Sequence, residues 1–95
     1  MAQTHELKCW PEFYEAIVGQ SKTFDLRKND RGFAVGDDII LREWEPNGHF
    51  YTGNFISRRI SYILEHRPDA GCAATFGLRE GYVILSLANS AQTEK

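Results

Sequence analysis

The sequence predicts a small α+β domain that is mainly β: a barrel of five to six strands with one helix between the first and second strands. Short apolar stretches that alternate with period 2 dominate the chain, helical spacing is rare, and the later stretches are apolar on both faces, as in a closed or covered sheet. The 95 residues suffice for one hydrophobic core. We expect a single domain over residues 4–88 and a disordered polar tail over 89–95.

Residues 4–9 alternate weakly between apolar and polar side chains and predict the first strand. Successive side chains of a strand point to opposite faces, so His5, Leu7 and Cys9 share one face. Lys8 lies on the other, polar face. It is therefore the residue of this strand that we expect to face a cleft.

The one predicted helix begins at Pro11, because proline suits the first helical turn and acidic residues follow it. Phe13, Ala16 and Ile17 have the i, i+3, i+4 spacing of an apolar helix face. Gly19 is expected to end the helix as its C′ residue.

Residues 22–28 predict the second strand and carry the most informative pattern of the chain. Alternation places Phe24 and Leu26 on one face. The other face carries a hydroxyl, a carboxylate and a guanidinium in one row, from Thr23, Asp25 and Arg27. Such a row can bind a polar ligand, whereas a solvated face with cross-strand ion pairs is the ordinary alternative. We expect Arg27 to be mostly buried and paired with Asp25 or another carboxylate.

The rest of the chain predicts strands separated by turns. Residues 29–32 form a turn cluster, residues 46–48 signal a hairpin, and residues 52–54 predict either a bulge or a second turn. Residues 65–77 predict a loop that includes at most a short helical turn. The strands are expected at 38–44, 55–64 and 82–87, with 50–51 as the return of the hairpin.

The charge is small overall but uneven. The chain carries a net charge of −2, which argues against a protein that coats nucleic acid by bulk electrostatics. Residues 22–31 carry +2, so the remainder carries −4. This local basic patch favours a bounded site for an anionic group. Within it, Lys28 and Arg31 either contact phosphate by simple charge or form a solvated turn.

No metal site or cofactor is predicted. The three histidines, at 5, 49 and 66, lack ligand spacing, and Cys9 and Cys72 stand in apolar contexts typical of small buried hydrophobic residues. No apolar run approaches the roughly 20 residues that span a bilayer, and no secretory signal opens the chain. We therefore expect a cytoplasmic location and no membrane partner.

Several motifs together resemble a known family. Lys22-Thr23-x-Asp25-x-Arg27, preceded by a helix with Gly19 near its end, resembles the signature of the ASCH domains. Further similar segments are Phe33-x-Val35-Gly36-Asp37 and Tyr82-Val83-Ile84-Leu85. The ordered set is most similar to a compact, largely uncharacterised branch common in bacteria and their phages. The resemblance implies a PUA-like β-barrel that handles RNA or modified nucleosides.

The leading hypothesis is an RNA- or nucleotide-binding module with a polar cleft beside residues 22–28. Phosphate would meet basic side chains of the patch, while an aromatic ring stacks on a base. Trp10 is the favoured ring, at the mouth between the first strand and the helix. The candidate ligand-binding residues are Lys8, Trp10, Lys22, Thr23, Asp25, Arg27, Lys28 and Arg31.

Two alternatives stay open. The first is a small amidohydrolase acting on acylated nucleosides such as N4-acetylcytidine, with Lys22 as base or proton shuttle and Asp25 paired to it. The resemblance implies a Thr and a later Glu in such enzymes, but Asp25 stands at the Thr position and only Glu65 offers a substitute. The second is a phage-type interaction protein that blocks a host complex through a protein–protein surface.

Overall fold

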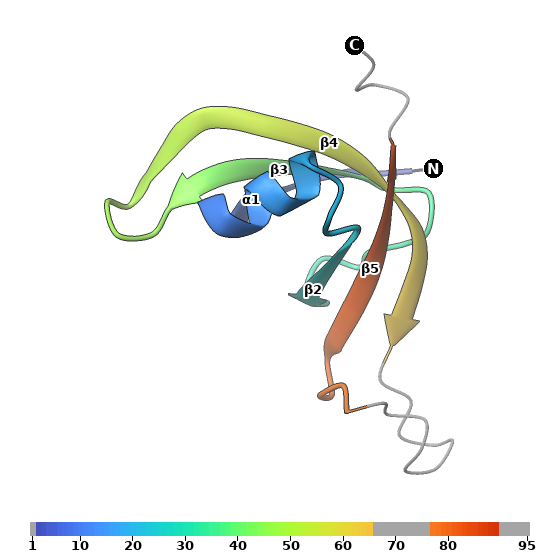
Figure 1. The fold of residues 1–95 in the computed structure, drawn as a ribbon. Coiled ribbons are helices and arrows are strands. Elements are labelled where there is room, and N and C mark those ends of the chain that lie inside the picture. The colour runs from blue at the N-terminus through green and yellow to red at the C-terminus, as the bar shows by residue number, and fades with distance from the viewer. Residues whose placement is uncertain (1, 66–76, 90–95) are drawn as a thin grey trace.

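A computed structural model describes residues 2–65 and 77–89 (Figure 1). Along the chain come β1 (Thr4–Cys9), α1 (Pro11–Val18), β2 (Phe24–Lys28), β3 (Asp38–Glu45), β4 (Phe50–Glu65) and β5 (Tyr82–Asn89). The element order agrees with the predicted α+β class. Asn89, predicted to start the tail, ends β5 instead. The rest of the predicted tail, and residues 66–76 of the predicted loop, lie outside the described residues.

The described strands form one sheet of order β1-β3-β4-β5-β2, which curls into a half-barrel (Figure 1). β1 runs parallel to β3, and the remaining pairs are antiparallel. β1 and β2 are the two edges of this sheet and are not paired with each other. The described sheet fits the small β-barrel class that the sequence predicts, and a seam remains between the two edge strands of this half-barrel.

Two register shifts interrupt the pairing of β4, the strand that curves most in Figure 1. One lies opposite Arg42–Trp44 and takes up residues 52–54, where Gly53 has φ +100°. The other lies between Ile60 and Tyr62. Of the bulge and the second turn that the sequence left open at residues 52–54, the structure has the bulge, and the hairpin return and the long strand are one element. Because an extra residue on one strand bends it and increases its twist, these bulges explain how an open sheet curls.

The core fills the hollow of the half-barrel and is covered by α1, which packs against β3. Only Ile17 of the helix is fully buried. β1 buries His5, Leu7 and Cys9, as its alternation predicted. The remaining core residues are Phe33, Ile39, Leu41, Ile60, Val83 and Leu85. With eight residues, α1 is far too short to cross a membrane, and the described residues contain no helix that could.

β2 has the predicted alternation, and Asp25 and Arg27 of the polar row face inward, whereas Thr23 precedes the strand and is exposed. Asp25 is 6% exposed, whereas Phe24 is 47% and Leu26 53% exposed. A carboxylate can face the interior here because Lys22 and Arg27 donate hydrogen bonds to it, and Arg27 also donates to a backbone carbonyl across the seam. The apolar side chains of this edge strand are consequently left on the outer side.

The turn after α1 differs from prediction by one residue. Gly19 is the C-cap with φ −78°, and Gln20 is the C′ residue in the left-handed region at φ 66°. The amide of Gln20 donates to the carbonyl of Ile17, and that of Ser21 donates to the carbonyl of Ala16. These two bonds define a Schellman motif, which delivers the chain from the helix to the start of β2.

A buried polar cluster fixes the start of β1 to the loop before β3. The Asp37 carboxylate accepts hydrogen bonds from the Gln3 and Ala34 amides and lies 2.9 Å from His5 Nε2. Burial by itself would raise the pKa of Asp37, but these hydrogen bonds outweigh it and hold the pKa below its ordinary value. His5 also packs edge-on against the Phe33 ring at a centroid distance of 4.9 Å.

Candidate functional site

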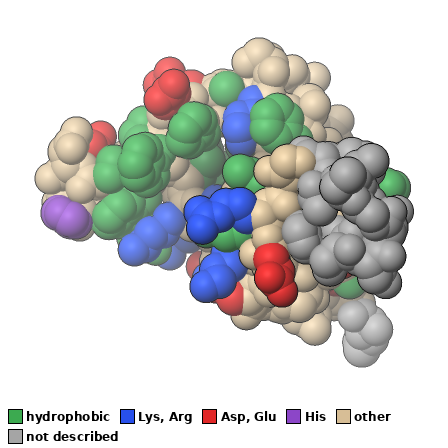
Figure 2. Space-filling view, turned by 90° about the horizontal axis from the view of Figure 1, so that it is seen from below, with side chains coloured by type: hydrophobic (Ala, Val, Ile, Leu, Met, Phe, Trp, Pro, Cys, Tyr) green, Lys and Arg blue, Asp and Glu red, His purple; other side chains and the backbone are tan. Residues whose placement is uncertain are grey.

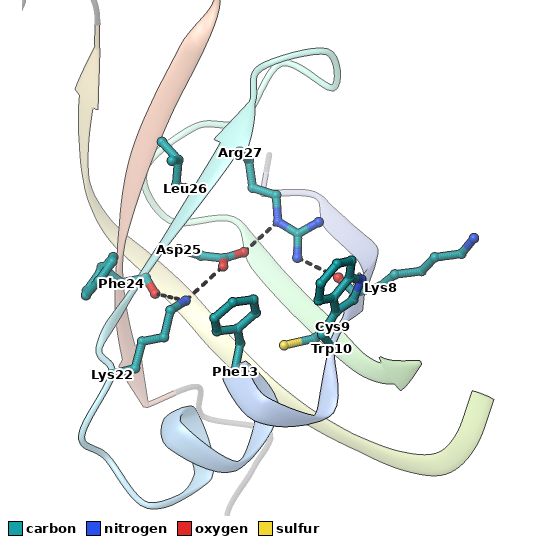
Figure 3. Close-up of a pocket in the computed structure, with 9 residues that line it drawn as sticks. All are labelled: Lys8, Cys9, Trp10, Phe13, Lys22, Phe24, Asp25, Leu26 and Arg27. Atoms are coloured by element: carbon teal, nitrogen blue, oxygen red, sulfur yellow. Dashed lines mark hydrogen bonds and ion pairs between the residues drawn. The ribbon is translucent and has the colours of Figure 1, made fainter. Parts of the chain in front are cut away.

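A cavity of about 510 Å³ lies in the seam, between the end of β1 with the first turn of α1 on one side and β2 on the other (Figure 3). We call it the aromatic cavity. Its lining comprises Lys8, Cys9, Trp10, Phe13, Lys22, Phe24, Asp25, Leu26 and Arg27. The site therefore occupies the gap that a closed barrel would have eliminated.

Asp25 is the centre of the charged group in this cavity. Its Oδ1 lies 3.1 Å from Lys22 Nζ, and its Oδ2 lies 2.6 Å from Arg27 Nε. The carboxylate side chain is 9% exposed, whereas the Lys22 and Arg27 side chains are 17% and 24% exposed. A nearly buried carboxylate is thus bound by two cations that reach solvent, which leaves an excess positive charge at the cavity surface.

Arg27 joins the two edges of the sheet. Its Nη2 donates to the Lys8 carbonyl at 2.6 Å while its Nε donates to Asp25 (Figure 3). The guanidinium presents five donors in a fixed plane, so one side chain can satisfy groups on both sides of the seam. The predicted pairing of Arg27 with Asp25 is confirmed, and the contact to β1 is one that the sequence did not predict.

Lys22 lies at the entrance of β2 and is fixed by three kinds of contact. Its Nζ donates to the Phe24 carbonyl at 2.8 Å and to Asp25. It also lies over the rings of Phe24 and Phe13, at 4.9 and 5.5 Å from their centroids. An ammonium has three donors, so in the described structure Lys22 still has one for a ligand.

Aromatic rings line the same cavity as the charges. Trp10 and Phe13 stack with centroids 6.2 Å apart and planes 20° apart. Both are substantially exposed, at 51% and 41%, and Phe24 adds a third exposed ring. Figure 2 shows hydrophobic side chains gathered beside Lys and Arg side chains on one face of the molecule. Exposed rings next to hydrogen-bonding charges are typical of surfaces that receive a planar ligand.

The structure brings five of the eight predicted ligand-binding residues to the aromatic cavity. Trp10, Lys22, Asp25 and Arg27 have side chains there, and Trp10 sits at the predicted mouth between β1 and α1. Lys8 contributes mainly its backbone: its side chain points away from the others in Figure 3, and its Nζ lies 4.2 Å from the centroid of the Trp44 ring.

The other three predicted residues lie elsewhere. Thr23 lines a second, smaller cavity, while Lys28 and Arg31 are exposed and line neither cavity. Sequence reasoning missed Phe13 and Phe24, which it took as packing residues. The signal that could have found Phe13 is its position three residues after Trp10, the N-cap residue of α1, a spacing that can place two rings side by side.

Cys9 lines the aromatic cavity but is not activated. Burial raises the pKa of its thiol to about 11, and the nearby Asp25 carboxylate acts in the same direction. The thiol is therefore protonated at neutral pH and is a poor nucleophile. The prediction of a buried cysteine is confirmed for Cys9, while Cys72 lies outside the described residues. Within residues 2–65 and 77–89, no group of His, Cys, Asp and Glu side chains could hold a metal ion.

Comparisons with known proteins place the chain in a family. The family described as "Domain of unknown function (DUF3850)" matches residues 4–87, so the chain belongs to that family. The chain is also 31% identical, over 78 residues, to a protein of Escherichia phage P2 described as "Uncharacterized 12.9 kDa protein in GpA 3'region". The match covers 70% of this chain and 70% of the phage protein.

Proposed function

We propose that this member of the DUF3850 family is a binding module that takes an RNA base or nucleoside into the aromatic cavity. The observation that carries the proposal is that exposed aromatic rings and a fixed group of charged side chains line the same cavity. Trp10 and Phe13 supply the rings, and Lys22, Asp25 and Arg27 supply the charges. The cavity volume of about 510 Å³ is in the range of small-molecule sites.

In this arrangement the base stacks on the Trp10 side of the cavity. The unused donor of Lys22 and the outer donors of Arg27 then face its carbonyl and ring-nitrogen acceptors. Both oxygens of Asp25 are used in its contacts to Lys22 and Arg27, so its role is to position the donors of these two side chains. Lys28 and Arg31, outside the cavity, would contact only the phosphate backbone of a longer RNA.

We further propose that the domain is a PUA-like barrel of the ASCH type. Three features support this: a curled sheet, a single helix between β1 and β2, and the Lys22-Thr23-x-Asp25-x-Arg27 run that leads into β2 beside a cavity. The described sheet differs from a full barrel in the open seam between its edge strands, β1 and β2.

The proposal is tested by titrating the protein with nucleosides, including cytidine and N4-acetylcytidine, and with short single-stranded RNAs at low and moderate salt. Trp10→Ala should weaken binding by about 5- to 150-fold, the equivalent of roughly 1–3 kcal/mol for a stacked base. Phe55→Ala is the matched control, because Phe55 is a 65% exposed ring on β4 that does not line the cavity. Absence of binding to all of these ligands would refute the proposal.

The amidohydrolase alternative has one favourable observation, the contact between Lys22 and Asp25 inside the cavity. Two observations weigh against it. Both Asp25 oxygens are engaged by cations, and Glu65, at the end of β4, does not line the cavity. The N4-acetylcytidine titration also decides this point: we expect binding without deacetylation. Turnover that disappears in Lys22→Ala would reverse the order of the two proposals.

The interaction-protein alternative is addressed by the same variants. Pull-down from bacterial lysate, with and without nuclease, separates a protein partner from RNA. A stoichiometric protein that survives nuclease and is lost in Phe55→Ala, but not in Trp10→Ala, would favour a protein–protein surface over the aromatic cavity.

A further inference from the structure

A second cavity, of about 230 Å³, lies between the turn that follows α1, the middle of β4 and the end of β5. Its lining is rich in hydrogen-bond donors and contains no acidic side chain. The lining residues with polar side chains are Gln20, Lys22, Thr23, Arg58 and Asn89, and aliphatic side chains from α1 and β5 complete it. A concave site with donors and no carboxylate is suited to an anion.

Arg58 is the cation of this cavity, and it is buried. It lies on the inner face of the sheet, opposite Ile39 on β3 and Asn89 on β5, and is 9% exposed. Its Nη1 donates to the carbonyl of its neighbour Ser57 at 2.9 Å. Burial lowers the pKa of Arg58 from its ordinary value, which is the direction expected of a desolvated cation.

Arg58 differs from the other strand arginines in having no carboxylate counter-ion among the described residues. Arg27, Arg42 and Arg59 lie 2.6, 3.7 and 3.2 Å from a carboxylate oxygen, respectively. No carboxylate of residues 2–65 or 77–89 forms an ion pair with Arg58, although it is the most buried of the four. A buried charge is normally paired, because removing it from water without a partner is costly.

The nearby helix end does not supply the missing charge. The C-terminal carbonyls of a helix carry a partial negative charge, but the Ala16 and Ile17 carbonyls of α1 already accept hydrogen bonds from the amides of the turn. The Arg58 guanidinium, whose hydrogen bond in the described structure goes to the Ser57 carbonyl, keeps other donors for a group that is not part of the described chain.

We propose that the second cavity binds a phosphate group, anchored by Arg58 and flanked by the side chains of Thr23, Gln20 and Asn89. A guanidinium matches two phosphate oxygens at once, and hydroxyl and amide donors match the others. The phosphate is either free or part of a nucleotide. Because Lys22 lines both cavities, a nucleotide whose base occupies the aromatic cavity places its phosphate toward Arg58. This second form rests on the proposed function.

The test compares inorganic phosphate with chloride at equal ionic strength, using calorimetry and the NMR signals of the Arg58 side-chain N–H and the Thr23 and Asn89 amides. We expect phosphate to shift these signals and raise the melting temperature, because a ligand that binds only the native state stabilises it. Arg58→Met should weaken phosphate binding at least about tenfold. Arg59→Met is the matched control, since Arg59 is the next residue on β4 and is paired with Asp38.

A second measurement separates a binding role from a structural one. In phosphate-free buffer, Arg58→Met should melt at the same temperature as the wild type or higher, because it removes an unpaired buried charge. A lower melting temperature together with no phosphate effect on the wild type would overturn the proposal. If the variant does not fold, the wild-type NMR signals decide alone: unchanged Arg58 signals at millimolar phosphate refute the site.

Cytidine and cytidine monophosphate distinguish the two sources. Tighter binding of the monophosphate that is weakened by both Arg58→Met and Trp10→Ala supports a nucleotide spanning both cavities. Phosphate binding without any nucleoside binding supports the phosphate site and refutes the proposed function. Nucleoside binding with no response of the Arg58 signals to either phosphate compound refutes the phosphate site and leaves the proposed function standing.

Discussion

Replacing Arg27 tests whether one side chain holds the open seam of the half-barrel together. Arg27→Ala removes a 2.6 Å hydrogen bond to Asp25 and a 2.6 Å hydrogen bond to the Lys8 carbonyl. A hydrogen bond to a charged group contributes roughly 1.5–3 kcal/mol when it is shielded from water, and less when it is exposed. Asp25 keeps its contact to Lys22, so the loss is smaller than for a carboxylate left unpaired.

From these contacts we expect Arg27→Ala to lower the free energy of unfolding by about 2–4 kcal/mol. For a domain of this size, that corresponds to a fall in melting temperature of roughly 10–25 °C. Lys28→Ala is the matched control, because Lys28 is an exposed residue on the same strand, and it should change stability by no more than about 0.5 kcal/mol. Arg27→Lys should fall between the two, since an ammonium lacks the fork that satisfies both acceptors.

The assay is thermal unfolding followed by circular dichroism, with urea unfolding to obtain the free energies. Equal small shifts for Arg27→Ala and Lys28→Ala would mean that Arg27 is a solvated strand residue and that the seam is held by other contacts. A large shift for Arg27→Ala that Arg27→Lys fully rescues would mean that charge alone, and not the two-sided contact, stabilises the seam.

Four further outcomes are expected. Gln20→Gly should stabilise the protein by about 0.5–1 kcal/mol in urea unfolding, because glycine adopts φ 66° without strain, and no gain would contradict the Schellman geometry. The pKa of Asp37 is lower in the folded protein than its ordinary value of 3.8, so the ionised carboxylate stabilises the fold at pH values above 3.8. This stabilisation is lost as the pH falls through the lowered pKa of the folded state, and Asp37→Asn should therefore lack this loss in thermal melts between about pH 5 and 2. Cys9 should react with iodoacetamide far more slowly than a free thiol at pH 7.5, as peptide mass spectrometry can measure, and rapid labelling would refute its burial. Ser57→Ala should be neutral or slightly stabilising, because the buried Ser57 hydroxyl has no partner within the described structure, and a loss above about 1 kcal/mol would reveal one.

Charges outside the cavity should affect only longer ligands. The double variant Lys28→Ala and Arg31→Ala removes two exposed cations that line neither cavity. We expect it to weaken RNA binding at low salt and to leave nucleoside binding unchanged. Equal weakening for both ligands would place the nucleoside outside the aromatic cavity.

Local patterns in the sequence determined the order and kind of the elements. Alternation placed His5, Leu7 and Cys9 on one buried face, Pro11 marked the start of α1, and residues 46–48 marked the hairpin. These features depend on neighbours a few residues apart, so they can be read without knowing the fold. The pairing of Arg27 with Asp25 was predictable for the same reason, because residues i and i+2 of a strand share a face.

Only the tertiary structure decided which face of β2 is inside. The polar row of β2 faces inward because the Lys8 carbonyl, 19 residues away, accepts from Arg27 across the seam. The same long-range arrangement leaves Trp10 and Phe24 exposed at a cavity, and it buries Arg58 without a carboxylate partner among the described residues. Composition and alternation establish that a strand has two different faces. In β2, which of the two faces is buried depends on groups brought together from distant parts of the chain, and no local pattern encodes those contacts.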